Sequence, residues 1–293
     1  MANLRAIRRR IKSVQSTAKI TKAMELVAAS KMRRAQASAL ASRPYAERMR
    51  WVLSDLSESL EELGDGVTHP FLERRTGDSV LLIHMTPDRG LAGGLNSNLN
   101  RAAIGRVLEE GRQGHNVSVL AVGRKGRDSF RRSRQRLLAE FTALGDYPTY
   151  EDTRPIARVV MEEYLAGRVD LVLLLFPQFV NTVTQRPTVR QLLPIIPEPD
   201  RATEAVDYIY EPSRQDVLNE LMPRYVEIQV YAAMLELIAS EQSARMVAMR
   251  NATENAKDLI EDLTLNYNKA RQDQITRELL EIVGGAEIMK SAG

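Results

Sequence analysis

The chain has 293 residues, of which 44% are hydrophobic and 27% charged, and its formal net charge is +3. This composition can supply a substantial core and excludes a chain that is disordered by default. The absence of cysteine excludes disulfides and thiolate metal sites, the three histidines are too far apart in sequence to suggest a metal site, and no apolar run reaches the ~20 residues that span a bilayer. We therefore expect a soluble or peripheral protein.

The N-terminal segment, residues 1–62, predicts one long helix. It contains no glycine, its first proline is Pro44, and it is rich in Ala, Arg, Lys, Leu and Met, which are strong helix formers. Apolar residues alternate at spacings of three and four, and then repeat less regularly: Leu4, Ile7, Ile11, Val14, Ala18, Met24, Val27, Ala28, Met32 and Ala35. A repeat of ~3.5 residues is typical of a left-handed coiled coil.

Positive charge is concentrated at this end of the chain. Residues 1–50 hold thirteen Lys and Arg against Glu25 and Glu47, which gives a local net charge of +11. Such a segment favours an acidic partner, either nucleic acid, anionic lipid or an acidic protein surface, although a solvated helix face is the simpler alternative. The opening "MANLRAIRRRIKSVQS" is similar to a targeting peptide, but its pattern continues into the long helix, so we interpret it as mature protein.

The middle segment, residues 75–212, predicts a small Rossmann-like α/β domain inserted between long terminal helices. Short apolar runs at 79–86, 116–123 and 170–177 alternate with helical patterns at 94–110, 124–136 and 154–165. Continuous apolar strands between helices indicate a parallel sheet that is covered on both faces. Residues 178–195 alternate as a hairpin, for which we predict a turn at Gln185-Arg186-Pro187.

The loop "DRGLAGGLN" (88–96) is the most suggestive motif, because it follows a strand and opens a helix. Phosphate is often bound at such a position. However, the loop lacks the G-x-G-x-x-G spacing, and no G-x-x-x-x-G-K-[ST] motif occurs in the chain. We therefore favour a structural turn over a nucleotide site, with Gly90, Gly93 and Gly94 serving packing and shape, and we expect no bound cofactor.

Other candidate chemistry is weak. The basic cluster "GRKGRDSFRRSRQR" (123–136) matches no nucleic-acid module, so a solvated helix face is the preferred interpretation. No Ser-His-Asp set, nucleophile elbow or paired carboxylates stand out. We predict that the chain is not catalytic by itself and has no metal site.

The last segment, residues 213–287, predicts a second long helix that pairs antiparallel with the first. Arg224–Val283 contains neither glycine nor proline, and Gly284-Gly285 supplies a stop signal. The spacing of three and four recurs in this segment at Met246, Met249, Thr253, Ala256, Ile260, Leu263, Tyr267 and Ala270.

Five stretches in family order resemble the gamma subunit family of F-type ATP synthase: 7–36, 88–96, 208–212, 239–256 and 267–286. The resemblance implies an asymmetric shaft of paired helices inside a ring of three alpha and three beta subunits. It also implies that the α/β domain is a membrane-proximal foot, bound to the epsilon subunit and to the c-ring of Fo. Catalysis would occur on beta, and this chain would bind no nucleotide or nucleic acid.

The resemblance also implies a location and a coupling role. The chain would be peripheral, on the cytoplasmic side of a bacterial plasma membrane, and would couple proton-driven c-ring rotation to ATP synthesis, or the reverse during hydrolysis. Many members carry Cys where this chain has Ala92, and the redox insertion of the chloroplast form is absent before "YIYEP". A basic coiled-coil protein that binds nucleic acid and a small α/β nucleotide enzyme remain the competing classes.

The resemblance also implies roles for individual residues of this chain that match positions of the family motifs. Met24 matches the shaft position that faces an acidic loop of beta. Tyr208 and Tyr210 match the foot near the c-ring. The positions linked to coupling and to polar contact with the catalytic ring are Arg245, Gln272, Thr276 and Glu278.

Overall fold

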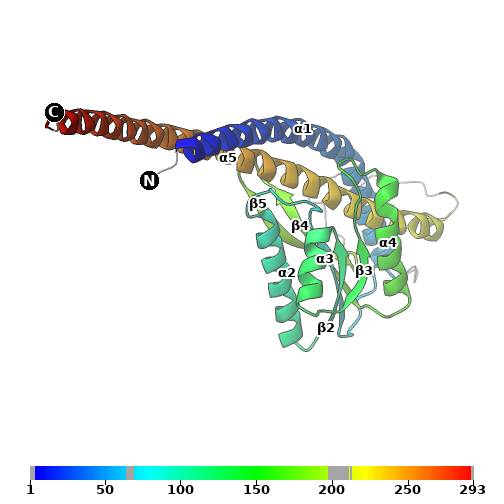
Figure 1. Ribbon diagram of the computed structural model, residues 1–293. Helices are drawn as coiled ribbons and strands as arrows, with labels where there is room; N and C mark the ends of the chain where they lie inside the picture. The colour runs from blue at the N-terminus through cyan, green and yellow to red at the C-terminus, as the bar shows by residue number, and fades with distance from the viewer. Residues whose placement is uncertain (1–3, 64–68, 197–210, 212, 292–293) are drawn as a thin grey trace. The chain divides into compact units, whose positions relative to one another are not determined.

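The computed structural model describes residues 4–63, 69–196, 211 and 213–291 (Figure 1). The chain forms two compact units, one made of Met1–Val27 with Met246–Gly293 and the other of Ala28–Arg245. Two long helices, α1 (Leu4–Leu63) and α5 (Arg214–Ser291), contribute to both units.

In the first unit, α1 and α5 pair antiparallel. The hydroxyl oxygens of Thr21 and Thr253 lie 2.7 Å apart, and Arg250 Nε donates to Glu25 Oε1 over 3.2 Å. Moving forward along α1 therefore means moving backward along α5. The predicted repeat in α5 is confirmed, because all of its members are buried or half-buried, and Ala252 is the one further half-buried position between Met249 and Ala270. The fold is thus α/β with helical, coiled-coil termini.

The seam on α1 differs from the sequence prediction in one stretch. Leu4, Ile7, Ile11, Val14 and Ala18 are half-buried among exposed neighbours, as predicted. The alternation then continues through two polar residues, Thr21 and Glu25, which are 8% and 6% exposed. Val27, predicted for the seam, is 53% exposed, so that assignment is wrong. An apolar pattern cannot identify seam positions that are occupied by polar side chains.

Helix α5 extends at both ends beyond Arg224–Val283, the segment without glycine or proline. It begins after Ser213, whose hydroxyl accepts from the Asp216 N–H, and it contains Pro223. Buried Leu218, Met222 and Val226 hold this first part in place. The predicted stop at Gly284-Gly285 is wrong, because α5 continues to Ser291. A helical glycine costs only about 1 kcal/mol relative to alanine, and no proline follows the pair to end the helix.

The second unit contains a five-stranded sheet in the order β3-β2-β1-β4-β5, in which only β5 is antiparallel to its neighbour. Its elements in chain order are β1 (Ser79–Met85), α2 (Leu95–Arg112), β2 (Asn116–Val122), α3 (Arg124–Arg132), β3 (Leu137–Phe141), α4 (Tyr150–Leu165), β4 (Leu171–Phe179) and β5 (Gln185–Leu193). The three predicted strands and the parallel arrangement are confirmed. Strand β3 was not predicted, because it is a short, half-buried edge strand behind an arginine-rich segment.

The predicted hairpin exists, but its turn was misplaced. Strand β4 runs to Phe179, the turn comprises residues 180–184, and Arg186-Pro187 lies inside β5. The side-chain oxygen of Asn181 accepts from the N–H groups of Val183 and Thr184 and so fixes the turn. Proline is tolerated in β5 because this is an edge strand.

Helices cover both faces of the sheet. On one face, Leu81, Ile83 and Met85 pack in a cluster with α4 and with α5 as far as Ala239. On the other face, Val80 and Leu82 pack with α2, α3 and Ala244 of α5. Helix α5 therefore passes from one face of the sheet to the other between Ala239 and Ala244, and Figure 1 shows this yellow-to-orange stretch running across one end of the sheet.

Candidate functional site

The helix pair of the first unit has a polar stretch in its seam. Thr21 and Thr253 share a hydrogen bond, and Thr253 also donates to the Met249 carbonyl over 2.8 Å. Glu25 accepts from Lys22 (3.0 Å) and Arg250 (3.2 Å). The Lys22 hydrogen bond, followed by that of Arg250, outweighs burial and lowers the pKa of the Glu25 carboxyl. This seam is therefore held in one register by directional contacts as well as by packing.

Met24 lies beside this polar stretch and is half-buried. The surrounding surface of α1 is mixed in character, because Lys22 is exposed and large apolar side chains are also exposed: Ile20 (60%), Leu26 (61%) and Val27 (53%). Apolar groups of this size, interleaved with cations, suit contact with a partner that offers both acidic and apolar groups.

The C-terminal part of α5 extends beyond its partner helix. At the register set by Thr21 and Thr253, the described start of α1 at Leu4 lies level with Ala270, which is the last half-buried position of α5 before the exposed residues 271–283. Residues 271–283 are all exposed, including Gln272, Thr276 and Glu278. Large apolar side chains are exposed among them, from 48% at Ile275 to 68% at Ile282. Three of the four predicted coupling positions on α5 are thus available to a partner.

The glycine loop, residues 88–96, joins β1 to α2. Gly93 has a φ of 55°, a left-handed conformation that favours glycine. Gly94 is right-handed, and an added Cβ there would lie 3.6 Å from Asn98, an ordinary contact; at Gly90 the nearest atom would be 4.0 Å away. Among Gly90, Gly93 and Gly94, only Gly93 therefore adopts a backbone conformation that favours glycine.

Arg245 lies inside the second unit and is only 8% exposed. Its Nη2 donates to Glu241 Oε1 over 2.5 Å and to the Gly90 carbonyl over 3.2 Å. Burial raises the pKa of the Glu241 carboxyl, and the charge of Arg245 opposes that shift. Within the chain, Arg245 therefore ties α5 to the glycine loop, which leaves little of its surface for direct contact with a partner.

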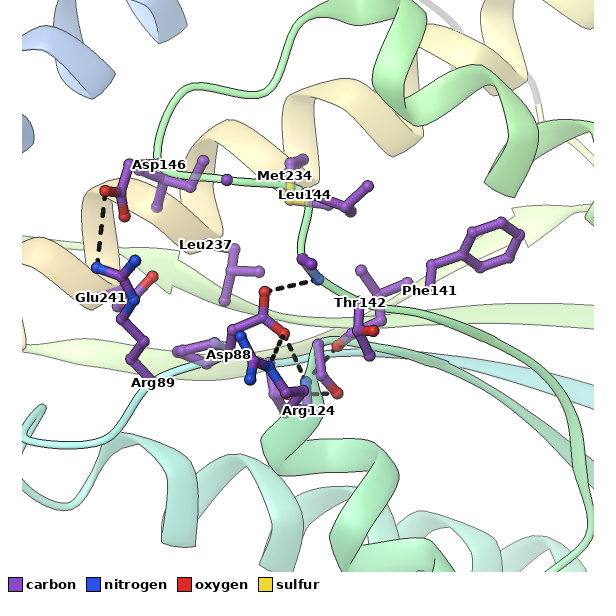
Figure 2. A pocket seen from close by; sticks show the side chains of 17 residues that line it. Asp88, Arg89, Arg124, Phe141, Thr142, Leu144, Asp146, Met234, Leu237 and Glu241 are labelled. Carbon is purple, nitrogen blue, oxygen red and sulfur yellow. Dashed lines mark hydrogen bonds and ion pairs between the residues drawn. The ribbon is translucent and has the colours of Figure 1, made fainter.

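A cavity of about 170 Å³ lies next to this cluster, at the carboxyl ends of β1, β2 and β3 (Figure 2). The carboxylates of Asp88, Asp146 and Glu241 line it. Asp146 binds Lys31 over 2.5 Å and Arg89 over 3.8 Å, and the Lys31 hydrogen bond is the main cause that lowers the pKa of Asp146. Sequence analysis missed these carboxylates, because they are brought together from three separate segments.

Asp88 occupies the position at which a doubly wound sheet often binds phosphate. Its two carboxylate oxygens accept from the main-chain N–H groups of Arg124, at the start of α3, and of Ala143, after β3, each over 2.9 Å. These donors are therefore already satisfied by an internal anion. The other two carboxylates of the cavity, Asp146 and Glu241, are likewise paired within the chain, with Lys31 and Arg245.

Tyr208 and Tyr210, the predicted foot residues, lie outside the described residues. Within the described part of the chain, no cluster of His, Cys, Asp or Glu side chains is arranged to hold a metal ion. Over the same residues, no helix has both the length and the apolar character needed to cross a membrane.

Comparison with known proteins identifies the family. A family model described as ATP synthase matches residues 3–289. An ATP synthase gamma chain from Dehalococcoides mccartyi (strain BAV1) is 54% identical over 286 residues, which cover 98% of this chain and 99% of the relative. The ATP synthase gamma chain of Roseiflexus castenholzii is also 54% identical, with 98% of each chain covered.

Solved structures show the same architecture. A chain from the central stalk and c-ring of Tetrahymena thermophila mitochondrial ATP synthase aligns with a TM-score of 0.60 and 26% identity, covering 80% of this chain and 99% of that chain. A chain from Euglena gracilis mitochondrial ATP synthase aligns with a TM-score of 0.69 and 19% identity, covering 99% and 95%, and supports the fold alone. These proteins define a class, the rotor subunits of rotary ATP synthases. The chain belongs to the bacterial-type gamma chain family of F-type ATP synthase.

Proposed function

We propose that this chain is the central-stalk rotor that couples rotation of a proton-driven c-ring to conformational cycling of catalytic beta subunits. ATP synthesis and hydrolysis would take place on beta, and this chain would transmit torque without binding nucleotide. The main support is the end of α5, where residues 271–283 are exposed and extend beyond the described start of α1. Exposed apolar side chains along the end of α5 indicate a surface that contacts a protein partner.

The partner of that end is the ring of three alpha and three beta subunits. Gln272, Thr276 and Glu278 supply polar contacts, and the apolar residues among them supply a surface that makes no directional bonds to the ring. Exposed polar pairs contribute only ~0–1 kcal/mol each, so such contacts are weak enough to exchange as the shaft turns. Arg245 acts differently, by holding the glycine loop against α5.

The α/β domain is the foot of the rotor in this proposal. It binds the epsilon subunit and rests on the c-ring, close to Tyr208 and Tyr210. Association with the membrane is indirect, through Fo, and the chain is peripheral on the cytoplasmic side of a bacterial plasma membrane. The support for this assignment is the membership of the gamma chain family and the central-stalk origin of the related structures.

Reconstitution tests the proposal. Purified chain is mixed with matching alpha and beta subunits, and assembly and ATPase rate are measured with and without it. We expect one copy per hexamer and sustained hydrolysis that depends on the chain. Failure to assemble with subunits that are competent with another gamma chain would refute the proposal. An affinity for DNA that falls steeply with the logarithm of salt concentration would instead favour a nucleic-acid-binding protein.

Met24 gives a sharper test. The Met24→Lys variant adds a cation to a surface that already holds exposed Lys22, and a persistent attraction to an acidic loop of beta would resist rotation. We expect ATP-driven proton pumping to fall relative to hydrolysis in membrane vesicles. Ala23→Lys, on the exposed neighbouring position, is the matched control. Equal pumping by the wild type and Met24→Lys would contradict this role.

A further inference from the structure

Strand β4 extends beyond the neighbour on one of its edges. Its pairing with β1 runs only from Val80–Leu171 to His84–Leu175, whereas β4 continues to Phe179. After Met85 the chain turns away toward β2, where the Thr86 N–H donates to the Val122 carbonyl. The edge of β4 that faces β1 is therefore left without a strand from residue 176 onward.

Main-chain groups on this overhang bind side chains of α5. The Phe179 N–H donates to Glu236 Oε2 over 2.7 Å, and the Pro177 carbonyl accepts from Ser240 Oγ over 3.0 Å. Residues two apart in a strand direct their peptide groups to the same edge, and β5 occupies the opposite edge as far as Phe179. A third bond continues into the turn, where Ser243 Oγ donates to the Thr182 carbonyl over 2.7 Å.

The three side chains form one row on α5. Glu236, Ser240 and Ser243 are four and three residues apart, a spacing that places them on one face of a helix. Both serines are fully buried. Ser240 and Ser243 lie on the stretch where α5 passes from one face of the sheet to the other, between Ala239 and Ala244, and Glu236 lies just before it. Helix α5 thus fills the gap where β1 and β4 part at their carboxyl ends.

A doubly wound sheet usually takes its ligand at such a point, where neighbouring strands lead in opposite directions. We infer that the shaft helix α5 is the permanent occupant of this crevice, and that Glu236, Ser240 and Ser243 replace the missing length of β1 as positioning residues that lock α5 to the sheet. Resting on the rotor function proposed above, this row is the joint through which the α/β domain transmits torque to the part of α5 that lies within the second unit.

Directional bonds matter because apolar contact alone does not fix a helix about its own axis. Each residue advances a helix by about 100°, so turning α5 by one residue position would carry all three side chains away from the strand. The main-chain groups of the overhang would then be left without partners, which is unfavourable for buried peptide groups.

Hydrogen exchange of the full-length chain tests the joint without any partner subunit. In Glu236→Ala, we expect the Phe179 amide to exchange about tenfold faster or more, because a hydrogen bond to a carboxylate is lost, while amides in the centre of β4 keep their rates. Glu236→Gln keeps an acceptor and should restore slow exchange. Thr188→Ala removes a hydroxyl that bonds within the same hairpin and not to α5, so it is the matched control. Unchanged exchange at Phe179 in Glu236→Ala would overturn the inference.

The mechanical role is tested in the reconstituted complex. We expect the Ser240→Ala/Ser243→Ala double variant to assemble and hydrolyse ATP but to pump fewer protons per ATP than the wild type and Thr188→Ala. Pumping equal to that of the wild type would overturn the torque role of the joint. Failure of the wild-type chain to assemble would refute the rotor function, whereas the exchange experiment would still decide whether α5 is locked by Glu236.

Discussion

The hydroxyl pair in the helix seam leads to a prediction in which two substitutions together cost less than either alone. Thr21 and Thr253 are 8% and 7% exposed, and their hydroxyl oxygens are 2.7 Å apart. Replacing one threonine with the isosteric valine removes a hydrogen bond from a buried site, at a cost of about 1 kcal/mol. In Thr21→Val/Thr253→Val both hydroxyls are gone and two methyl groups meet in their place. Replacing both partners of a hydrogen bond by apolar groups of the same shape is nearly neutral.

Hydrogen exchange of amides in residues 246–256 reports local opening of this pair. We expect each single variant to speed exchange about fivefold, the factor that corresponds to about 1 kcal/mol, and the double variant to remain within about twofold of the wild type. Thr264→Val is the control, since the Thr264 hydroxyl is exposed and donates only to the Ile260 carbonyl of its own helix. Additive costs in the double variant would refute the reasoning, because they would mean that the hydroxyls act independently.

Three further predictions concern titration and backbone conformation. Burial lowers the pKa of His84 from 6.5 to about 4, so between these pH values the unfolded chain binds a proton that the folded chain excludes. The free energy of unfolding should therefore fall by about 3 kcal/mol as the pH drops from 6.5 to 4. Urea midpoints of His84→Met should lack this part of the pH dependence. The hydrogen bond from Lys22 is the main cause that lowers the pKa of Glu25, so the ionised carboxylate stabilises the fold above pH 4.5 and this stabilisation is lost as the pH falls below that value. In the same titration, Glu25→Gln should lack this acid-induced loss of stability. Gly93→Ala should destabilise the chain by about 1 kcal/mol because of its positive φ, whereas Gly94→Ala should be nearly neutral, and equal urea midpoints for the two variants would contradict this assignment.

Much of the architecture follows from short-range information in the sequence. A glycine- and proline-poor composition with spacings of three and four predicts paired long helices, because helix propensity and heptad packing are local properties. Likewise, β1, β2 and β4 are continuous apolar runs, since strands covered on both faces need no polar alternation. The resemblance to the gamma chain family depended on five contiguous sequence motifs that occur in the order found in the family.

Other features were decided by contacts between distant segments. Glu25 is a seam residue because Arg250 and Lys22 satisfy its charge, and an apolar repeat does not reveal this. Arg245 matches a family position for contact with partners, yet the fold buries it against Glu241 and the glycine loop. The course of α5 across the sheet end depends on how far β4 extends past β1, and strand pairing lengths are not encoded by any single segment. Burying a polar or charged group is favourable only when its partner is supplied, and only the tertiary structure brings those partners together.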